Sequence, residues 1–191
     1  FLKKMDVPTP QNKLKIHILN KHTPKEEIHG FLNTCRNGSN IGLISEAGCP
    51  GVADPGAEIT NLAHIEDIQV VPLVGPSSIL LALMASGMNG QCFSFNGYLP
   101  IKTSELKKKL QKLEINSRNY NQTQIFIETP YRNNKLIDSI CQNLQGNTKL
   151  CIACDLSLNS EYIKTKTIYE WKKISKPDFK KRPCIFLVHA H

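Results

Sequence analysis

Strand-like and helix-like patterns alternate along most of the chain. Short apolar runs are typical of buried strands, whereas apolar positions three or four residues apart are typical of helices. Strands are predicted at 40–45, 69–74, 92–96, 124–128, 149–156 and 184–189. Helices are predicted from about 24 to 35, from 55 onward, from 77 to about 87, over 104–114 and over 133–144, with a mixed segment at 162–174. This alternation indicates an α/β architecture.

The first residues depart from this alternation. The chain opens on Phe1-Leu2-Lys3-Lys4, without an initiator methionine and without a strand before its first predicted helix. That helix has clear start signals, because Pro24 stands at its first position and Glu26 and Glu27 make its first turn acidic. We therefore expect the chain to lack the first strand–loop–helix unit of its sheet.

The composition fits a folded protein of one large domain or two small ones. The chain has 191 residues, of which 40% are hydrophobic, enough to form a substantial core. This composition excludes collagen-like, coiled-coil and mostly disordered classes. The longest apolar stretch, around Ile79–Ala85, is far shorter than the roughly 18 residues of a membrane span. We expect no integral membrane segment.

Seven cysteines are scattered along the chain, mostly within apolar runs. Such positions are typical of reduced core residues, and we expect a cytoplasmic protein. Cys151 and Cys154 have the spacing of a redox motif, but they lie in a strand-like run, whereas a thioredoxin-type pair opens a helix. His189 and His191 have no further candidate ligands nearby in sequence. No metal site is expected.

Positive charge is unevenly distributed along the chain. Through Tyr98 there are 7 Lys and Arg residues against 8 Asp and Glu, whereas from Leu99 onward there are 17 against 8. The net charge of +8 therefore comes entirely from the second half. We place a domain boundary here, with an N-terminal domain of residues 1–98 and a basic C-terminal domain of residues 99–191. A basic half indicates a polyanionic partner, RNA or DNA, although a lysine-rich surface without such a partner explains the charge equally well.

A glycine- and proline-rich loop follows the first predicted strand. It runs from Ile44 to Gly56 and combines three glycines with two prolines. Bare backbone at the carboxyl end of a strand is where open α/β sheets bind ligands. Asp54 precedes a helix and is explained first as its cap, with direct ligand contact as the alternative. Glu46 has no such structural role, so we expect it to face a ligand.

Two further polar turns follow predicted strands. Gly75-Pro76-Ser77-Ser78 leads into a helix, where free amides and hydroxyls suit a carboxylate or phosphate, although Ser77 is also explained as a helix cap alone. We expect this turn and the first loop to face one crevice. Glu128-Thr129-Pro130-Tyr131-Arg132 ends another strand in the basic half, either as part of a ligand site or as a capped turn with a surface ion pair.

The order of these motifs resembles that of the tetrapyrrole methylase superfamily. The resemblance covers nearly the whole chain and is strongest for the branch of ribosomal small-subunit RNA (cytidine-2′-O)-methyltransferases I. It rests on Leu2-Lys3-Lys4, Asn20-Lys21-His22, Ser45–Gly56, Gly75–Ser78, Ala85-Ser86-Gly87, Phe95–Pro100 and Glu128–Arg132. It implies two αβα domains with S-adenosylmethionine (SAM) in the cleft between them, usually in a homodimer.

The resemblance also implies which residues bind SAM. In the first domain they are Ser45, Glu46, Ala47, Gly48, Pro50, Asp54, Pro55, Pro76, Ser77 and Ser78. In the second they are Glu128, Tyr131, Arg132, Cys154, Leu156, Pro183 and Ile185. The chain departs from the family pattern in lacking the first strand and its glycine turn, and in having Tyr131 and Glu46 where histidine and aspartate are usual. It also ends soon after its last strand, as in a shorter sub-branch with a different substrate.

The resulting hypothesis is a SAM-dependent methyltransferase that acts on the 2′-hydroxyl of a cytidine in small-subunit ribosomal RNA. A ribose hydroxyl is a poor nucleophile, so a general base would help, and Glu46 and Glu128 are the candidates. Phosphate attraction would come from Lys102, Lys107, Lys108, Lys109, Lys112, Lys180, Lys181 and Arg182. Two alternatives stay open: a methyltransferase for a small molecule such as a tetrapyrrole precursor, and a non-catalytic RNA-binding relative.

Overall fold

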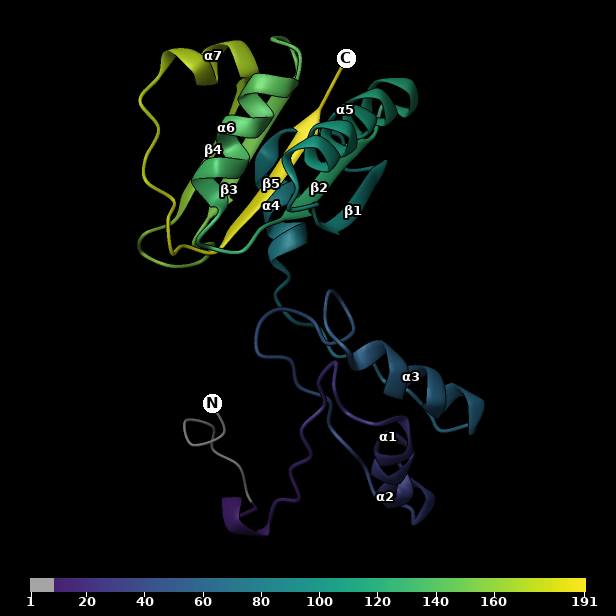
Figure 1. Ribbon diagram of the computed structural model, residues 1–191. Helices are drawn as coiled ribbons and strands as arrows, with labels where there is room; N and C mark the ends of the chain where they lie inside the picture. The colour runs from purple at the N-terminus through teal and green to yellow at the C-terminus, as the bar shows by residue number, and fades with distance from the viewer. Residues whose placement is uncertain (1–8) are drawn as a thin grey trace. The chain divides into compact units, whose positions relative to one another are not determined.

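The computed structural model describes residues 9–191, which divide into two compact units (Figure 1). The first unit extends to Gly75, and the second runs from Pro76 to His191. This division differs from the expected boundary between residues 98 and 99. The reason is that the helix after Pro76 and the strand that ends at Tyr98 both pack on strands from the basic half of the chain.

The second unit is built on one five-stranded sheet. Its strands are β1 (Phe93–Tyr98), β2 (Thr123–Ile127), β3 (Lys149–Cys154), β4 (Tyr162–Thr167) and β5 (Cys184–His189). They are ordered β1-β2-β5-β3-β4, with β1 parallel to β2 and every other neighbouring pair antiparallel. The strands predicted in this unit are confirmed to within about two residues at each end. The mixed segment 162–174 divides into β4 and a short helix.

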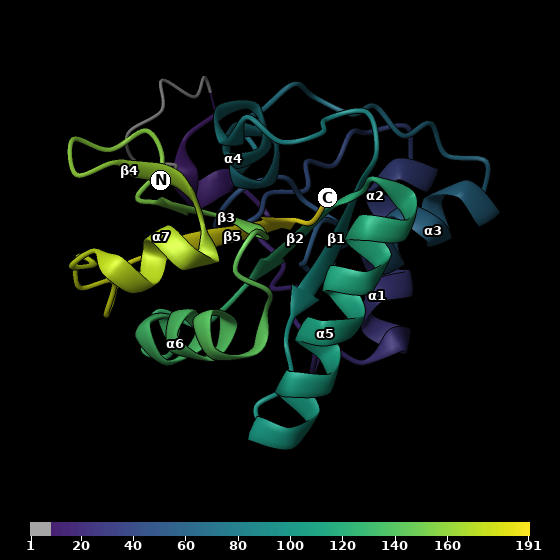
Figure 2. The same cartoon turned by 90° about the horizontal axis from the view of Figure 1, so that it is seen from above.

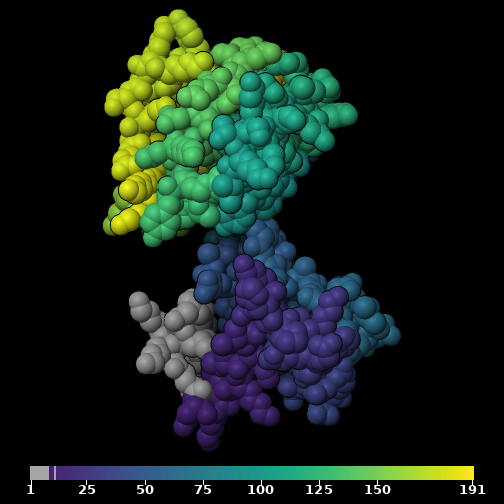
Figure 3. All heavy atoms as spheres, in the orientation of Figure 1, coloured from purple at the N-terminus to yellow at the C-terminus, as the bar shows by residue number. Residues whose placement is uncertain are grey.

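Helices cover both faces of this sheet (Figure 2). α5 (Thr103–Tyr120), α6 (Asn133–Asn143) and α7 (Ile168–Lys173) lie on one face, and α4 (Ser78–Ser86) lies on the other. On the three-helix face, Leu110, Phe126 and Trp171 are fully buried in the larger core. On the other face, Ala82 and Leu83 pack against a smaller core from β2, β3 and β5. In the space-filling view, the teal-to-green atoms, which include those of α5 and α6, form one continuous surface (Figure 3).

The apolar stripe of α5 explains why this helix lies on the sheet. Its buried apolar positions recur every three or four residues and are Leu106, Leu110 and Leu113. The helix continues to Tyr120, beyond the predicted end at residue 114. The apolar stripe stops at Leu113, but the buried face of the helix continues with the polar residues Glu114 and Ser117. Glu114 Oε1 accepts hydrogen bonds from the backbone N–H of Gln145 (2.8 Å) and from the Thr148 hydroxyl, so this buried carboxylate is satisfied.

The first unit has a much smaller core and no strand among its described residues. Its helices are α1 (Lys25–Phe31), α2 (Asn33–Arg36) and α3 (Gly56–Ile65), with a 3-10 turn at Gln11–Lys13. The helix predicted over 24–35 is thus present as two pieces that meet at Leu32. The core consists of Ile28, Phe31, Leu32, Ile59, Leu62 and Ala63. An ion pair between Arg36 and Glu66 joins the ends of α2 and α3.

The strands predicted at 40–45 and 69–74 are wrong, since the structure assigns no strand to either segment. Both segments carry the apolar residues of a strand, yet Ile44, Val71 and Leu73 are exposed. A strand needs a neighbouring strand to satisfy its backbone N–H and C=O groups. No described element of the first unit supplies one, so the apolar pattern alone does not produce a sheet.

Two kinds of feature are absent from the described residues. No helix in this range is long and apolar enough to cross a membrane. The same residues contain no group of three or more His, Cys, Asp or Glu side chains placed to hold a metal ion.

Candidate functional site

Three segments predicted to bind a cofactor meet at one edge of the sheet. β2 and β3 both end at this edge, and β5, which runs antiparallel to them, begins there. The register pairs Ile127 with Ile185 and Cys154 with Cys184. The turns that follow β2 and β3 therefore lie beside the turn that precedes β5. We call residues 128–132, 155–161 and 179–183 the carboxyl edge.

Glu128 and Arg132 form an ion pair at the carboxyl edge. Glu128 Oε1 accepts a hydrogen bond from the backbone N–H of Thr129 (2.7 Å), and Glu128 Oε2 lies 3.1 Å from Arg132 Nη2. This second contact has ion-pair distance without hydrogen-bond alignment, so the buried Oε2 has no hydrogen-bond partner. The intervening Tyr131 is exposed. The motif thus combines a buried acceptor with an exposed ring.

Asn133, the first residue of α6, joins this motif to the turn before β5. Its Nδ2 donates to the carbonyls of Arg182 (2.7 Å) and Phe179 (3.0 Å) and to Cys184 Sγ (3.3 Å). Its Oδ1 is buried without a hydrogen-bond partner. Sequence reasoning missed this residue. Its place directly after the Glu128–Arg132 motif is the one signal that could have found it.

Asp155 and Arg182 join the turn after β3 to the turn before β5. Arg182 Nε donates to Asp155 Oδ2 at 2.8 Å, and Arg182 Nη2 donates to the carbonyl of Ser160 at 2.7 Å. The Ser160 hydroxyl also donates to Asp155 Oδ2 (2.9 Å). Burial raises the pKa of Asp155, but these hydrogen bonds outweigh that effect and hold the pKa below its usual range. Asp155 lies inside the predicted strand 149–156 and the predicted cofactor segment Cys154–Leu156, but sequence reasoning gave its side chain no role of its own.

The two cysteines with redox spacing do not face each other. Cys154 packs in the larger core, whereas Cys151 packs in the smaller core on the opposite face of the sheet. This follows from strand geometry, because side chains three residues apart point to opposite faces. The register partner of Cys154 is Cys184, and burial raises the pKa of both thiols. Buried, protonated thiols are poor nucleophiles and poor metal ligands.

In the first unit, Asp54 organises the predicted ligand loop. Its Oδ1 accepts hydrogen bonds from the backbone N–H groups of Gly51 (2.6 Å) and Gly56 (2.8 Å). Burial raises its pKa, but these bonds and a hydrogen bond with Ser45 outweigh that effect, so the pKa lies below its usual range. Because Gly56 is the first residue of α3, Asp54 satisfies the first amide of this helix, although the N-cap position itself is held by Pro55.

Gly56 is required by close packing inside the same loop. A Cβ atom at this position would lie 2.8 Å from Leu43 Cδ2 and 2.9 Å from both Asp54 Oδ1 and Gly51 N. All three distances are shorter than the contacts that Cβ atoms make in folded proteins. Only glycine therefore lets the loop close against the start of α3.

The rest of the loop and the Pro76–Ser78 turn are largely exposed. The exposed members are Glu46, Ala47, Gly48, Pro50 and Pro55 in the first unit and Pro76 and Ser78 in the second. Ser77 is the N-cap residue of α4, but its side chain makes no capping hydrogen bond. Its hydroxyl therefore does not serve as the helix cap. That the loop and the turn face one crevice stays a prediction.

The predicted RNA-binding residues fall into two groups. Three have polar partners: Lys102 with Glu105 (3.3 Å), Lys109 with Asn96 (3.3 Å) and Arg182 with Asp155 (2.8 Å). The other five are exposed: Lys107, Lys108, Lys112, Lys180 and Lys181. Lys180, Lys181 and Arg182 belong to the carboxyl edge, whereas the other five residues lie on α5 or in the turn before it.

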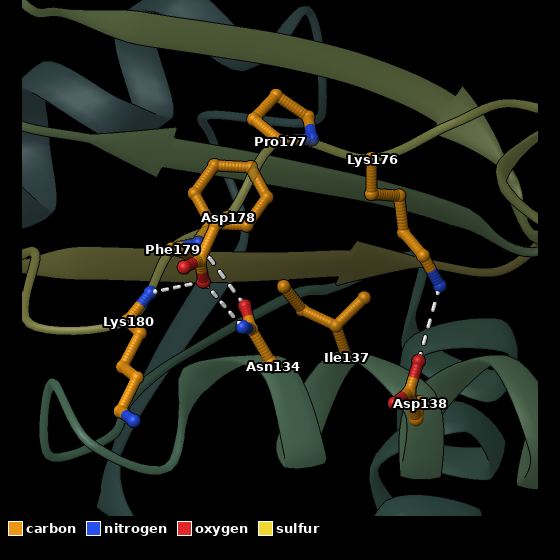
Figure 4. Close-up of a pocket in the computed structure, with 8 residues that line it drawn as sticks. All are labelled: Asn134, Ile137, Asp138, Lys176, Pro177, Asp178, Phe179 and Lys180. Atoms are coloured by element: carbon orange, nitrogen blue, oxygen red, sulfur yellow. Dashed lines mark hydrogen bonds and ion pairs between the residues drawn. The ribbon is translucent and has the colours of Figure 1, made fainter.

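A pocket of about 340 Å³ lies between α6 and residues 176–180, next to the carboxyl edge (Figure 4). Asn134 Nδ2 donates to Asp178 Oδ1 (2.6 Å), and the backbone N–H of Lys180 donates to the same oxygen (2.9 Å). On the other side, Lys176 Nζ lies 3.2 Å from Asp138 Oδ1. Because these lining groups pair with one another, their main role is to attach the segment 176–180 to α6.

Curated relatives show what the chain is similar to. It is 31% identical over 181 residues to a Vibrio cholerae protein named ribosomal RNA small subunit methyltransferase I, a match that covers 93% of this chain and 61% of that protein. A protein of the same name from Buchnera aphidicola is 32% identical over 85% of this chain and 57% of its own length. The Bacillus subtilis protein of that name is 34% identical over 78% and 50%. The chain thus spans about half to three-fifths of the length of these relatives, and no family model matches it.

Solved structures share the fold at low identity. The methyltransferase CobJ has a TM-score of 0.62 at 14% identity and covers 95% of this chain and 77% of its own. Diphthine synthase has a TM-score of 0.57 at 14% identity over 88% and 68%, and the cobalt precorrin-4 methyltransferase CbiF has 0.54 at 16% over 88% and 72%. Likeness at these identities concerns the fold alone. It confirms the α/β fold of the tetrapyrrole methylases that the motifs predicted.

Proposed function

We propose that this chain, which belongs by sequence with the ribosomal RNA small subunit methyltransferases I and by fold with the tetrapyrrole methylases, acts as a SAM-dependent methyltransferase on small-subunit ribosomal RNA. The proposed acceptor is the 2′-hydroxyl of a cytidine. One observation supports this most directly: segments that the resemblance links to SAM, far apart in sequence, meet at the carboxyl edge. The 31% identity over 93% of the chain supports the same reaction class.

The chemistry of the carboxyl edge fits SAM. This cofactor carries a sulfonium and an ammonium group, which favour negative charge, and an adenine amino group, which favours a hydrogen-bond acceptor. Two buried acceptors in or next to the edge have no hydrogen-bond partner: Glu128 Oε2, which is ion-paired with Arg132, and Asn133 Oδ1. A buried acceptor without a partner costs free energy unless a ligand or water completes it. We therefore assign Glu128, Asn133 and the backbone of Cys154–Leu156 and Pro183–Ile185 to the cofactor.

When bound, SAM supplies an electrophilic methyl group that passes to the acceptor oxygen by in-line displacement. The chain must align the acceptor and remove its hydroxyl proton, and alignment alone supplies several powers of ten in rate. Glu46 suits proton removal because it is exposed, whereas the Glu128 side chain is 1% exposed and lies against Arg132. We assign proton removal to Glu46 and ligand holding to Glu128 with Arg132. Tyr131, exposed beside this pair, would position the acceptor.

RNA binding would rest on the exposed lysines. Lys180 and Lys181 flank the carboxyl edge, and Lys107, Lys108 and Lys112 extend the positive charge along α5. Each phosphate that a lysine neutralises adds about 0.7–0.9 to the slope of log affinity against log salt concentration. Binding that weakens steeply with salt is therefore expected. Lys102 and Lys109 contribute less, because each already contacts a polar partner.

The cellular setting is part of the proposal. On the resemblance, we propose that the protein works in the cytoplasm as a homodimer.

Methyl transfer from radiolabelled SAM to small-subunit ribosomal RNA tests the proposed function. The expected product is labelled RNA whose nuclease digest contains 2′-O-methylcytidine. Glu46→Gln should lower kcat by about 10²-fold with little change in the KM for SAM, as for the loss of a general base. The matched variant Glu58→Gln, an exposed carboxylate on α3, should leave kcat unchanged.

Other outcomes of this assay would favour the alternatives. Label in a tetrapyrrole precursor instead of RNA would favour the small-molecule enzyme, the second of the three hypotheses. RNA binding without detectable binding of SAM or S-adenosylhomocysteine by calorimetry would overturn the enzyme and favour a non-catalytic RNA-binding relative.

A further inference from the structure

Arg182 differs from the neighbouring lysines because its guanidinium contacts other residues of the protein and not solvent alone. Lys180 and Lys181 are exposed, whereas the Arg182 side chain is 26% exposed and points its guanidinium at Asp155 and Ser160. Contacts of 2.8 Å and 2.7 Å hold it in this direction. A guanidinium paired with a carboxylate and with a carbonyl has less charge and fewer donors left for phosphate.

The ion pair is part of a network across the carboxyl edge. The backbone N–H of Asp155 donates to the carbonyl of Pro183 (3.0 Å), so the turns after β3 and before β5 are joined by backbone as well as side chains. Two further hydrogen bonds tie the turn before β5 to the region after β2: Lys181 N to Pro130 O (3.0 Å) and Asn133 Nδ2 to Arg182 O (2.7 Å). Arg182 therefore stands where all three turns connect.

The backbone of these turns needs such a restraint. Asp155, Ser157 and Lys181 have φ values of +50°, +64° and +62°. For residues other than glycine this left-handed region is unfavourable and persists where surrounding contacts hold it. The contacts of Arg182 with Asp155 and Ser160 span the turn that contains two of the three. Loss of these contacts would let residues 155–161 leave that conformation.

We propose that Arg182 is a positioning residue that acts through Asp155, and not a contact for RNA phosphate. By holding the turns after β3 and before β5 in one conformation, the pair keeps Cys154–Leu156 and Pro183–Ile185 ready to bind the cofactor. This inference rests on the proposed function, because it concerns the same site. It requires Arg182 and Asp155 to act as a unit, because the ion pair between them adds to the backbone bond and to the Arg182–Ser160 contact that join the two turns.

Cofactor binding by Arg182→Gln, Asp155→Asn and the double variant tests this proposal. Calorimetry with S-adenosylhomocysteine should show an affinity about tenfold lower in each single variant than in the unaltered chain. The double variant should lose no more affinity than either single variant does. In the methyl-transfer assay, the loss should appear in the KM for SAM with kcat little changed. Arg182→Lys keeps the charge but cannot bridge Asp155 and Ser160 with a planar fork, so it should also weaken binding. Circular dichroism checks that each variant is folded.

Hydrogen exchange and RNA binding supply the controls. Exchange at residues 155–161 should become faster in Asp155→Asn and in Arg182→Lys. Lys180→Gln is the matched control for a phosphate contact: it should keep the affinity for S-adenosylhomocysteine and reduce the salt slope of RNA binding by about 0.7–0.9. Arg182→Gln should leave that slope unchanged.

A phosphate contact makes the opposite predictions. Asp155→Asn would then free Arg182 and strengthen RNA binding, and Arg182→Gln would reduce the salt slope by about 0.7–0.9. Either result, together with unchanged affinity for S-adenosylhomocysteine, would overturn the positioning role. Unchanged exchange at residues 155–161 in both variants would also overturn it. If the unaltered chain binds neither SAM nor S-adenosylhomocysteine, the proposed function fails. If the unaltered chain binds and the variants bind equally tightly, only the positioning role of Arg182 fails.

Discussion

Similar apolar segments are buried in the second unit and exposed in the first. Residues 124–128 form most of β2 and bury Ile125 and Phe126 completely. Residues 69–74 have an equally strand-like composition, yet Val71 and Leu73 are 62% and 87% exposed. β2 has β1 and β5 as neighbours, whereas no described strand pairs with 69–74. An apolar run therefore indicates a segment that can form a strand. Whether the segment does so and becomes buried depends on the presence of a neighbouring strand.

The cores of the two units differ in the same direction. The larger core of the second unit joins three helices to the sheet and contains Phe126, Trp171 and Phe186. The core of the first unit consists of six apolar residues on or beside short helices. Because burial of apolar surface is the main favourable contribution to folding, the second unit should be the more stable. Trp171, the only tryptophan in the chain, reports on that unit alone.

Removing an aromatic ring from the larger core should have the largest effect on this difference. Phe126→Ala removes a fully buried ring stacked on Phe186 and should lower the free energy of unfolding of the second unit by about 3–5 kcal/mol. Urea unfolding followed by Trp171 fluorescence measures this loss. The matched variant Phe31→Ala, in the core of the first unit, should leave the fluorescence transition in place. An equal shift from both variants would show that the units do not unfold separately.

Gly56→Ala should have the next largest effect, confined to the first unit. The added methyl would meet Leu43, Asp54 and Gly51 at less than 3 Å, and such overpacking typically costs about 1–3 kcal/mol. Hydrogen exchange of the α3 amides should become faster. Gly42→Ala is the control, since no atom lies within 4 Å of its Cβ position. Equal acceleration in both variants would argue against the packing explanation.

Acid should distinguish the two units through two aspartates whose pKa values lie below the usual range, Asp155 in the second unit and Asp54 in the first. The pKa of Asp155 in the folded chain lies below its ordinary value of 3.8, so its ionised form stabilises the second unit. This contribution is complete above the ordinary value and is lost as the pH falls through the folded pKa. Asp155→Asn should flatten the acid side of the stability curve followed by Trp171 fluorescence. Asp54→Asn removes a similarly lowered pKa from the first unit and should leave that curve unchanged.

Polar substitution in the unpaired segment should have the smallest effect. Val74 is fully exposed, so Val74→Thr should change stability by no more than about 0.5 kcal/mol. Val188→Thr places a hydroxyl in the larger core, where burial of a polar group without a partner costs about 1–3 kcal/mol. Thermal melting monitored by circular dichroism compares the two. A large loss from Val74→Thr would mean that residues 69–74 are buried in solution.

The strands of the second unit could be predicted because their signal is local. Residues 184–189 and 149–154 are nearly continuous apolar runs, as expected for strands covered on both faces. β4 was hidden because its sequence, Tyr-Ile-Lys-Thr-Lys-Thr, is mostly polar. It pairs with β3 alone and lies at the edge of the sheet, where lysine side chains can reach solvent.

The candidate site could be predicted only in part. Glu128 and Arg132 were marked by a motif, and the segments at 154–156 and 183–185 by the family resemblance; the sheet brings them to one edge. The contacts of Asn133 and Asp155 could not be predicted from the sequence, although Asn133 directly follows the Glu128–Arg132 motif and Asp155 lies inside the segment 154–156. Their partners lie 46 and 27 residues away in the chain, in the turn before β5. No pattern within a few consecutive residues reports such a contact.

The sequence by itself determined most helices and strands of the second unit, the position of the glycine- and proline-rich loop, and the likeness to methyltransferases. Only the tertiary structure decided which apolar runs are buried and which charges are paired. Periodicity depends on a few consecutive residues, so it can be seen along the chain. Strand pairing and the ion pair between Asp155 and Arg182 bring together segments that are far apart in the sequence. Which segments meet is set by the packing of the whole unit.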